Sequence, residues 1–397
     1  MVAGARVDYL APTLYLLDLV WLGLLIIQRS KIKDQKLIQN LKTLLENKRL
    51  WVMAGLVVIN IWVAERPEVA IYKWLRFGQL VWVILRIYES RNLRIKIKNS
   101  LGWIIPIWIV MESWLGLAQV VNGGSLEGIW YWLGERRFAL GGIGLAEWQV
   151  AGENMIRAYG TFSHPNSLAG FLLVVLIYWL GIYESRNLRI KNVYKWIVVW
   201  SGVLGIVLSG SRMVWGVGIL AAIFNLKFLI FKQFLSIKFL NFRKTIGYGA
   251  VFGGVIILIL GLVSINYEVG DFVGGWDRNS INKRLELVRQ AGEMIKKNPL
   301  FGVGAGNFLV AQPKFEIEGQ GRWRQPVHNI FLLWVSEMGI ITTIFLISNF
   351  QFLISKQIQK FKNKLIILGI IGMTGMVDHY WLTLPQNWWL MAIMLAV

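Results

Sequence analysis

Residues 167–183 read SLAGFLLVVLIYWLGIY, and this stretch decides the fold. It carries no charged residue, and its length is within the range that a helix needs to cross the apolar layer of a bilayer. A basic segment, 184–195, follows it directly. An uncharged run of this length that ends in a basic segment predicts a transmembrane helix.

The rest of the chain has the same character. Of its 397 residues, 56% are hydrophobic and 16% are charged, whereas soluble domains carry about 25% charged residues. We therefore predict an all-α fold, a polytopic transmembrane helical bundle of about eleven spans in the lipid bilayer. The predicted spans are 9–28, 50–64, 70–85, 101–121, 167–183, 196–208, 213–226, 245–264, 328–349, 365–377 and 388–397. The absence of cysteine excludes disulfides, thiolate metal sites and thiol catalysis.

The net charge of +20 is confined to every second loop. Five loops hold 25 Lys/Arg and 4 Asp/Glu: 29–49, 86–98, 184–195, 227–244 and 350–364. The alternate loops hold 14 of each sign: 65–69, 122–166, 209–212, 265–327 and 378–387. This positive-inside pattern predicts a multi-pass protein of the cell inner (cytoplasmic) membrane, with its N-terminus outside and its C-terminus inside. Because the membrane accounts for the charge, we expect no nucleic-acid partner.

Two features leave the span count open. The short spans 196–208 and 213–226 are joined by Ser209-Gly210-Ser211-Arg212, so they are either two full spans or a re-entrant hairpin. The last span, 388–397, is too short to cross a bilayer at 1.5 Å per residue. The sequence therefore does not decide whether the chain is a fragment that lacks terminal spans.

The topology can be tested by labelling, because the chain has no cysteine of its own. A cysteine introduced at Gly319 should react with an impermeant thiol reagent in intact cells, and one at Lys238 should be protected. The reverse result, protection at Gly319 and labelling at Lys238, would overturn the topology and place the predicted site on the cytoplasmic side.

The long outer loop 265–327 contains a helical pattern over 281–297. One stripe of this helix is apolar and comprises Ile281, Leu285, Val288, Ala291 and Ile295, so the helix is expected to lie on the membrane surface or on the bundle. Arg284 falls within this stripe, where a charge needs a partner. It is therefore either a snorkelling or salt-bridged side chain or an anion ligand that faces the bundle.

The segment 298–308, NPLFGVGAGNF, follows this helix. Its proline ends the helix, and its glycines permit positive φ, which predicts a structural turn. It is not GxGxxG, and the chain contains no GxxxxGK[ST], so we assign no ATP-driven step.

Several cations are predicted to gather at the outer membrane face from segments that are distant in sequence: Arg157, Arg212, Lys73 and Arg76. Cations near hydrocarbon are costly and are often functional, and arginine suits bidentate contact with phosphate. A lipid-linked phosphate or diphosphate is therefore the expected ligand. Each of these residues taken alone would be explained as an interface anchor.

His328 opens the span 328–349 together with Asn329. At a helix N-terminus the dipole favours the neutral imidazole, which a general base requires. The alternative is an interfacial polar residue. His164 and His379 are weaker candidates, and three histidines this far apart show no metal-ligand spacing, so we expect no metal site.

Four segments together resemble the O-antigen ligase and polymerase superfamily. In chain order they are Arg157 with GTFSHPNSLAGFL, SGSRMVWG around Arg212, Arg284-Leu-Glu-Leu-Val-Arg289 with NPLFGVGAGNF, and His328-Asn329 with Glu337-Met-Gly339. The resemblance runs from about residue 157 to about 385. It suggests N-terminal transmembrane helices over 1–121 and an O-antigen ligase-like core over 122–397, with outer loops 122–166 and 265–327.

The resemblance implies a metal-independent, cofactor-free glycosyltransferase. Its donor would be a polyprenyl-diphosphate-linked glycan, and its acceptor a hydroxyl on a lipid, a growing glycan or a protein. Arg157, Arg212 and Arg284 would hold the diphosphate, and His328 would activate the acceptor. Lys73, Arg76, Arg289 and Asn329 are the expected substrate contacts.

Two alternatives stay open at this point. A polysaccharide polymerase would use the same site. A transporter of lipid-linked glycans would instead need a polar path through the spans, for which Asp18, Glu112 and Glu337 are the candidates.

Overall fold

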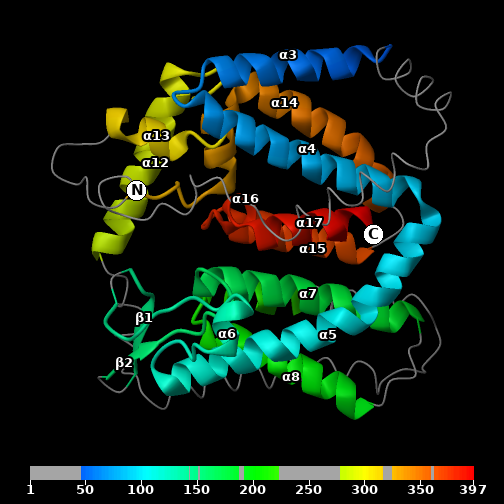
Figure 1. Ribbon diagram of the computed structural model, residues 1–397, viewed down its shortest axis with the longest axis vertical. Helices are drawn as coiled ribbons and strands as arrows, with labels where there is room; N and C mark the ends of the chain where they lie inside the picture. The colour runs from blue at the N-terminus through cyan, green and yellow to red at the C-terminus, as the bar shows by residue number, and fades with distance from the viewer. Residues whose placement is uncertain are drawn as a thin grey trace. The chain divides into compact units, whose positions relative to one another are not determined.

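The computed structural model describes residues 46–142, 144–150, 153–186, 192–222, 278–315, 324–358 and 362–397. This part of the chain is mainly helical (Figure 1). It divides into two compact units that alternate along the sequence. The first unit comprises Met1–Trp82 and Arg284–Ile354, and the second comprises Val83–Lys283 and Ser355–Val397. The predicted boundary at residue 121 rests on resemblance and stays a prediction.

Within the described residues, the first unit contains five helices and a 3-10 turn. They are α3 (Lys48–Trp62), α4 (Pro67–Glu89), α12 (Arg278–Lys297), α13 (Phe308–Ala311), η1 (Gln312–Phe315) and α14 (Ile330–Ile358). The Asn47 side chain caps α3 by accepting a hydrogen bond from the Arg49 amide. Phe77 of α4 contacts Trp334 of α14 edge to face, with ring centroids 6.1 Å apart, so these two helices share an aromatic core.

The second unit is a helical bundle with a small hairpin. Its elements are α5 (Arg91–Asn122), α6 (Ile129–Trp132), β1 (Glu147–Val150), β2 (Glu153–Ile156), α7 (Pro165–Arg186), α8 (Asn192–Leu208), α15 (Lys362–Gly375), α16 (Tyr380–Thr383) and α17 (Pro385–Ala396). Helices α5, α7 and α8 lie side by side (Figure 1), and α15 and α17 pack on α7. Ser90 caps the start of α5, and Gly123, at φ +66°, ends it.

The predicted helical class is confirmed, and the predicted number of spans is not. Three described helices are long and apolar enough to cross a membrane: Arg91–Asn122, Pro165–Tyr183 and Ile330–Asn349. Shorter apolar helices are Val193–Leu208, Arg212–Ala222 and Ile366–Gly375. The predicted spans 9–28 and 245–264 lie outside the described residues.

Two expectations are corrected in this part of the chain. The fold is not purely α, because β1 and β2 pair antiparallel, with Glu147 opposite Ile156. The basic segment 86–98 is helical almost throughout, because α4 runs to Glu89 and α5 starts at Arg91.

The predicted continuous span 328–349 is interrupted at Gly339. This residue has φ +72° and ψ +168°, so α14 consists of two helical segments joined by a kink. A Cβ at this position would collide with the carbonyl oxygen of Leu300. Glycine is therefore required both by the backbone conformation and by the close approach of the loop that follows α12.

That loop completes the hydrogen bonding of α14 at the kink. Four backbone hydrogen bonds join the two segments: Val303 N to Ser336 O at 2.9 Å, Gly304 N to Glu337 O at 3.1 Å, Ile340 N to Pro299 O at 2.9 Å, and Ile341 N to Leu300 O at 3.2 Å. In an unbroken helix, the carbonyls of 336 and 337 would accept from 340 and 341. The segment 299–304 therefore satisfies the groups that the kink exposes.

Candidate functional site

Arg157 lies in the second unit, where two other segments fix its guanidinium. Its Nε donates to the carbonyl oxygen of Ser209 at 2.6 Å, and its Nη2 donates to Oδ1 of Asn166 at 2.8 Å. Ser209 belongs to the turn between α8 and the helix that starts at Arg212. The structure thus brings Arg157 against the turn that leads into Arg212, as the prediction of a shared site requires.

The side chain of Asn166 is itself held in place by Asp378. Its Nδ2 donates to Oδ2 of Asp378 at 2.9 Å, and Oδ1 of Asp378 accepts from the His379 amide at 2.8 Å. An amide that accepts from arginine and donates to a carboxylate has a fixed orientation. Neither Asn166 nor Asp378 was among the predicted site residues. The only sequence signal was the Ser-His-Pro-Asn turn at the start of a span.

Two buried polar residues of α5 hold the turn 158–163, which follows Arg157, by hydrogen bonds. Glu112 accepts from the Thr161 amide at 2.8 Å and from the Thr161 hydroxyl at 2.6 Å. Gln119 accepts from the Gly160 amide at 2.8 Å and donates to the Gly160 carbonyl at 2.9 Å. Both side chains are fully buried, so their polar groups need these bonds. They act as anchors of the motif turn.

Gly160 should not tolerate a side chain. Its φ is +58°, and an added Cβ would collide with Oε2 of Glu112. We expect Gly160→Ala to lower the free energy of unfolding by at least about 1–3 kcal/mol, since it combines left-handed backbone with a displaced buried carboxylate. Thermal unfolding of the purified protein in detergent measures this. Gly78→Ala in α4 is the matched control, because nothing lies within 4 Å of its added Cβ. Equal melting temperatures for the two variants would contradict the anchoring role of Glu112.

Arg212 is exposed at the first residue of the helix Arg212–Ala222. The preceding turn is built by Gly210, at φ +62°, and by Ser209, whose hydroxyl donates to the Ile206 carbonyl at 2.6 Å. The described residues thus show a tight turn between α8 and the helix Arg212–Ala222, and the choice between two full spans and a re-entrant hairpin stays open. Arg212 is an exposed cation at the N-terminus of this helix, the end that favours negative charge.

In the first unit, the glycine-rich loop after α12 is a structural turn, as predicted. Gly302, Gly304 and Gly306 all have positive φ, between +69° and +95°. The carboxylate of Glu337 accepts from the Gly306 amide at 2.9 Å and from the Phe308 amide at 3.3 Å. This buried acid of the kinked helix therefore holds the loop.

Asn60 of α3 supports the same loop. Its Nδ2 donates to the carbonyls of Phe301 and Glu337 at 2.8 and 2.9 Å, and its Oδ1 accepts from the Ala305 amide at 2.9 Å. The side chain is fully buried, and sequence reasoning did not single it out.

Lys73 and Arg76 have partners within the first unit. Lys73 lies in the electrostatic field of Glu337, of opposite charge. The guanidinium of Arg76 bonds to the Tyr72 hydroxyl at 3.0–3.1 Å and to Oε1 of Gln79 at 3.2 Å. These contacts give both cations a structural role, and their predicted contact with substrate stays a prediction.

Helix α12 forms where it was predicted, but its apolar stripe packs on protein only in part. Ala291 of the stripe is buried, whereas Leu285 and Val288 are 62% and 42% exposed. The face that packs on protein comprises Ala291 together with Leu287, Gln290 and Met294, and contact of the exposed stripe with the membrane surface stays a prediction. The helix carries two apolar stripes, and the periodicity of the sequence does not reveal which of them packs on protein. The buried Gln290 is satisfied by Glu286 and Gln312, both at 3.0 Å.

The two predicted cations of α12 are both exposed. Arg284 is therefore not buried in an apolar stripe, which corrects the expectation that it needs a partner there. Arg289 forms an ion pair with Glu286 at 3.0 Å, and this hydrogen-bonded pair lowers the pKa of Glu286. Arg284 can thus reach an anion outside the helix bundle, whereas Arg289 has a protein partner.

His328 lies near the N-terminus of α14, two residues before its first residue, Ile330. Its Nε2 lies 3.3 Å from Oε1 of Gln325, and the side chain is half-buried. Asn329 caps the helix, because its Oδ1 accepts from the amides of Phe331 and Leu332 at 2.9 and 3.0 Å. The oxygen of Asn329 is therefore occupied in capping α14, and its contact with the substrate stays a prediction.

The predicted site residues fall into two sets, one in each unit. Arg157 and Arg212 belong to the second unit, together with Asn166 and Asp378. The first unit carries the rest: Lys73, Arg76, Arg284, Arg289, His328 and Asn329. Each set has a preformed local geometry within its own unit.

Comparison with known proteins gives one match. The sequence profile of a family described as O-antigen ligase matches residues 197–347. This range includes Arg212, Arg284 and His328, whereas Arg157 lies before it. Such a match, together with the apolar helices, indicates a membrane protein of ligase or polymerase type. No curated protein and no solved structure matches the chain.

Proposed function

We propose that this chain transfers a glycan from a polyprenyl-diphosphate carrier to an acceptor hydroxyl, because its residues 197–347 match the profile of the O-antigen ligase family. The reaction takes place at the outer face of the cell inner membrane. The observation that carries the proposal is the fixed guanidinium of Arg157, which Ser209 and Asn166 orient beside the start of the Arg212 helix.

The chemistry needs fixed positive charge at the leaving group. The acceptor oxygen attacks the anomeric carbon, the bond from that carbon to the diphosphate oxygen breaks, and the diphosphate leaves with the electron pair. Its negative charge grows in the transition state, so arginines already in place stabilise the transition state more than the bound donor. Arg157, Arg212 and Arg284 are assigned this role. A direct displacement inverts the anomeric carbon.

The acceptor must lose its proton during the attack, and His328 is assigned as the general base. Capping by Asn329 fixes the backbone directly after His328, which places the imidazole at the start of α14. The sugar–diphosphate bond is already activated, so the proposal includes no metal and no nucleotide.

The test is a reconstituted reaction with the full chain in liposomes, a lipid-linked glycan and a candidate acceptor. The proposal predicts a glycosylated acceptor and free polyprenyl diphosphate, in the presence of a chelator. Supplying either a lipid core or a second carrier-linked glycan as acceptor separates ligase from polymerase. Movement of intact donor across the membrane, without release of the diphosphate, would instead indicate a transporter.

The transporter alternative has less support in the described part of the chain. A polar path needs acids that can exchange partners, but Glu112 holds the turn at Thr161, and Glu337 holds the loop at Gly306 and Phe308. Both carboxylates therefore have structural tasks. The third candidate, Asp18, lies outside the described residues.

A further inference from the structure

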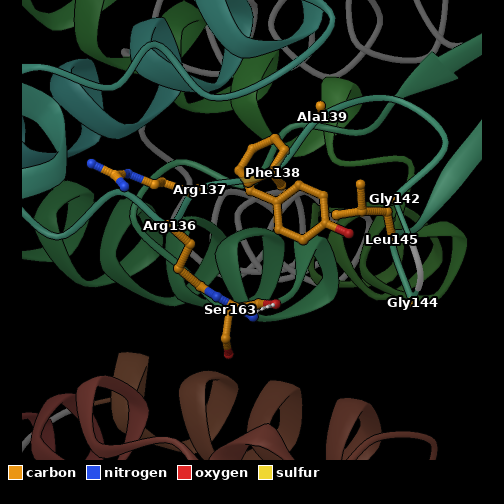
Figure 2. A pocket seen from close by; sticks show the side chains of 9 residues that line it. Arg136, Arg137, Phe138, Ala139, Gly142, Gly144, Leu145 and Ser163 are labelled. Atoms are coloured by element: carbon orange, nitrogen blue, oxygen red, sulfur yellow. Dashed lines mark hydrogen bonds between the residues drawn. The ribbon is translucent and has the colours of Figure 1, made fainter. Parts of the chain in front are cut away.

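The predicted outer loop 122–166 contains a pocket that none of the roles above uses (Figure 2). It has a volume of about 280 Å³ and lies entirely within the second unit. Its lining includes four large side chains, those of Arg136, Arg137, Phe138 and Tyr159, and the small residue Ser163. A pocket of this size holds about one sugar ring rather than an extended glycan.

The lining of the pocket combines positive charge with aromatic surface. Among the described lining residues two are arginines, and none is acidic. Arg136 donates from Nη1 to the Ser163 carbonyl at 2.8 Å, which Figure 2 shows as a dashed line. That bond fixes the guanidinium and uses one of its five N–H groups, so others remain for an anion. Arg137 lies 3.9 Å from Glu127 and over the Tyr131 ring, so its positive charge already has partners in the protein.

The aromatic part of the pocket is rigid. The rings of Phe138 and Tyr159 lie 4.8 Å apart, and Tyr159 is buried. The Tyr159 hydroxyl accepts a hydrogen bond from the Ala146 amide at 2.7 Å, and its own proton is therefore able to donate. Burial raises the pKa of Tyr159 above its ordinary value, which already lies well above neutral pH, so the hydroxyl is a donor there. Aromatic rings beside a hydroxyl donor suit the C–H faces and hydroxyls of a sugar.

The segment 138–141 beside the pocket is held in place by backbone and side-chain hydrogen bonds. Phe138 and Ser125 exchange three bonds of 2.9–3.2 Å, and the Leu140 amide donates to the Gly123 carbonyl at 3.1 Å. The Gly141 amide donates to Oε1 of Glu147, on β1, at 2.8 Å. A segment held in this way does not have to be ordered when a ligand binds, which reduces the entropic cost of binding.

We propose that this pocket binds a carboxylate-bearing sugar, with the Arg136 guanidinium on the carboxylate and the Phe138 and Tyr159 rings against the sugar ring. This inference rests on the proposed function, because the sugar bound in the pocket would be one unit of the transferred glycan. Tyr159 is two residues from Arg157 along the chain and belongs to the anchored turn that follows Arg157, so the pocket lies on the segment next to the residue assigned to the diphosphate. The pocket would thereby select acidic glycans.

The proposal is tested by binding of methyl glucuronide and methyl glucoside to the purified full chain in detergent, measured by saturation-transfer NMR and calorimetry. We expect the glucuronide to bind at least about tenfold more tightly, the gain typical of one charge-assisted hydrogen bond. Arg136→Gln should remove that preference. Ala139→Phe, which fills the pocket from an exposed lining position, should abolish binding of both sugars.

Lys296→Gln is the matched control, since it removes one exposed positive charge of the other unit, and it should bind as the wild type does. Equal affinity for the two sugars, no binding of the glucuronide, or unchanged binding by Arg136→Gln would each overturn the proposal. These outcomes are independent of catalysis. A wild-type protein that binds the glucuronide but transfers no glycan would contradict the proposed function and leave the pocket standing.

Discussion

Replacing His328 by alanine is expected to lower glycan transfer by about 10²–10⁴-fold, the usual contribution of a general base. Binding of the lipid-linked donor should stay nearly unchanged, because the arginines carry it. The backbone at this position is set by the Asn329 cap of α14, so the variant should retain the fold. The measurement is the initial rate of transfer in liposomes, with donor binding determined separately.

The other two histidines serve as controls. His164 accepts a hydrogen bond from the Asn166 amide at 3.1 Å, and His379 bonds to the Thr383 hydroxyl at 2.8 Å, so each has a local structural role. Their alanine variants should cost much less activity than His328→Ala. Transfer by His328→Ala at the wild-type rate would mean that the base is elsewhere. Loss of wild-type activity with chelator would instead point to a metal, for which Glu316 and Glu318, outside the described residues, would be tested first.

Arg157→Lys is expected to lower transfer by about 10²-fold, similar to the loss of one transition-state donor. Lysine keeps the charge but cannot make the two fixed bonds that Arg157 makes to Ser209 and Asn166. Arg212→Lys and Arg284→Lys should impair transfer in the same direction. Arg66→Lys is the matched control, because Arg66 is exposed and its guanidinium pairs with Glu68. Full activity of all three lysine variants would remove the diphosphate role.

Asp378 gives an independent test of the same arrangement. Asp378→Ala removes the acceptor that holds Asn166, whereas Asp378→Asn keeps an oxygen there. If Asp378 positions Arg157, the alanine variant should lose turnover without a change in melting temperature or donor binding, and the asparagine variant should restore most of the rate. A parallel loss of stability and activity in both variants would indicate a purely structural role.

The helices could be predicted because their signals are local. Long apolar runs marked α5, α7 and α14, and Asn298-Pro299 marked the end of α12. The same signals could not show that α14 breaks at Gly339, since a single glycine within an apolar run is common in membrane helices. The four-residue strands β1 and β2 were missed because so short an alternation does not stand out from a loop.

The site was only partly predictable, and the reason is the distance along the chain between its parts. Arg157 and Arg212 could be singled out as isolated cations beside predicted spans. The bond from Asn166 to Asp378 joins residues 212 positions apart, and no local pattern reports such a pair. The sequence left open whether the apolar stripe of α12 lies on the bundle or on the membrane surface, and it gave no signal that Leu287 and Met294, beside that stripe, would be the residues that pack on protein.

The exchange of backbone bonds at the Gly339 kink limits how this protein can vary in length. The segment 299–304 occupies the place of one turn of the α14 hydrogen-bond ladder: the carbonyls of Pro299 and Leu300 accept, and the amides of Val303 and Gly304 donate, in a fixed order. An inserted or deleted residue there would shift all four bonds out of register at once, inside an apolar helix where no solvent can replace them. The segment is therefore an integral part of the α14 hydrogen-bond ladder and not a linker of adjustable length. Its spacing is set by the helix it completes, so related chains should be free to change its side chains but not its length.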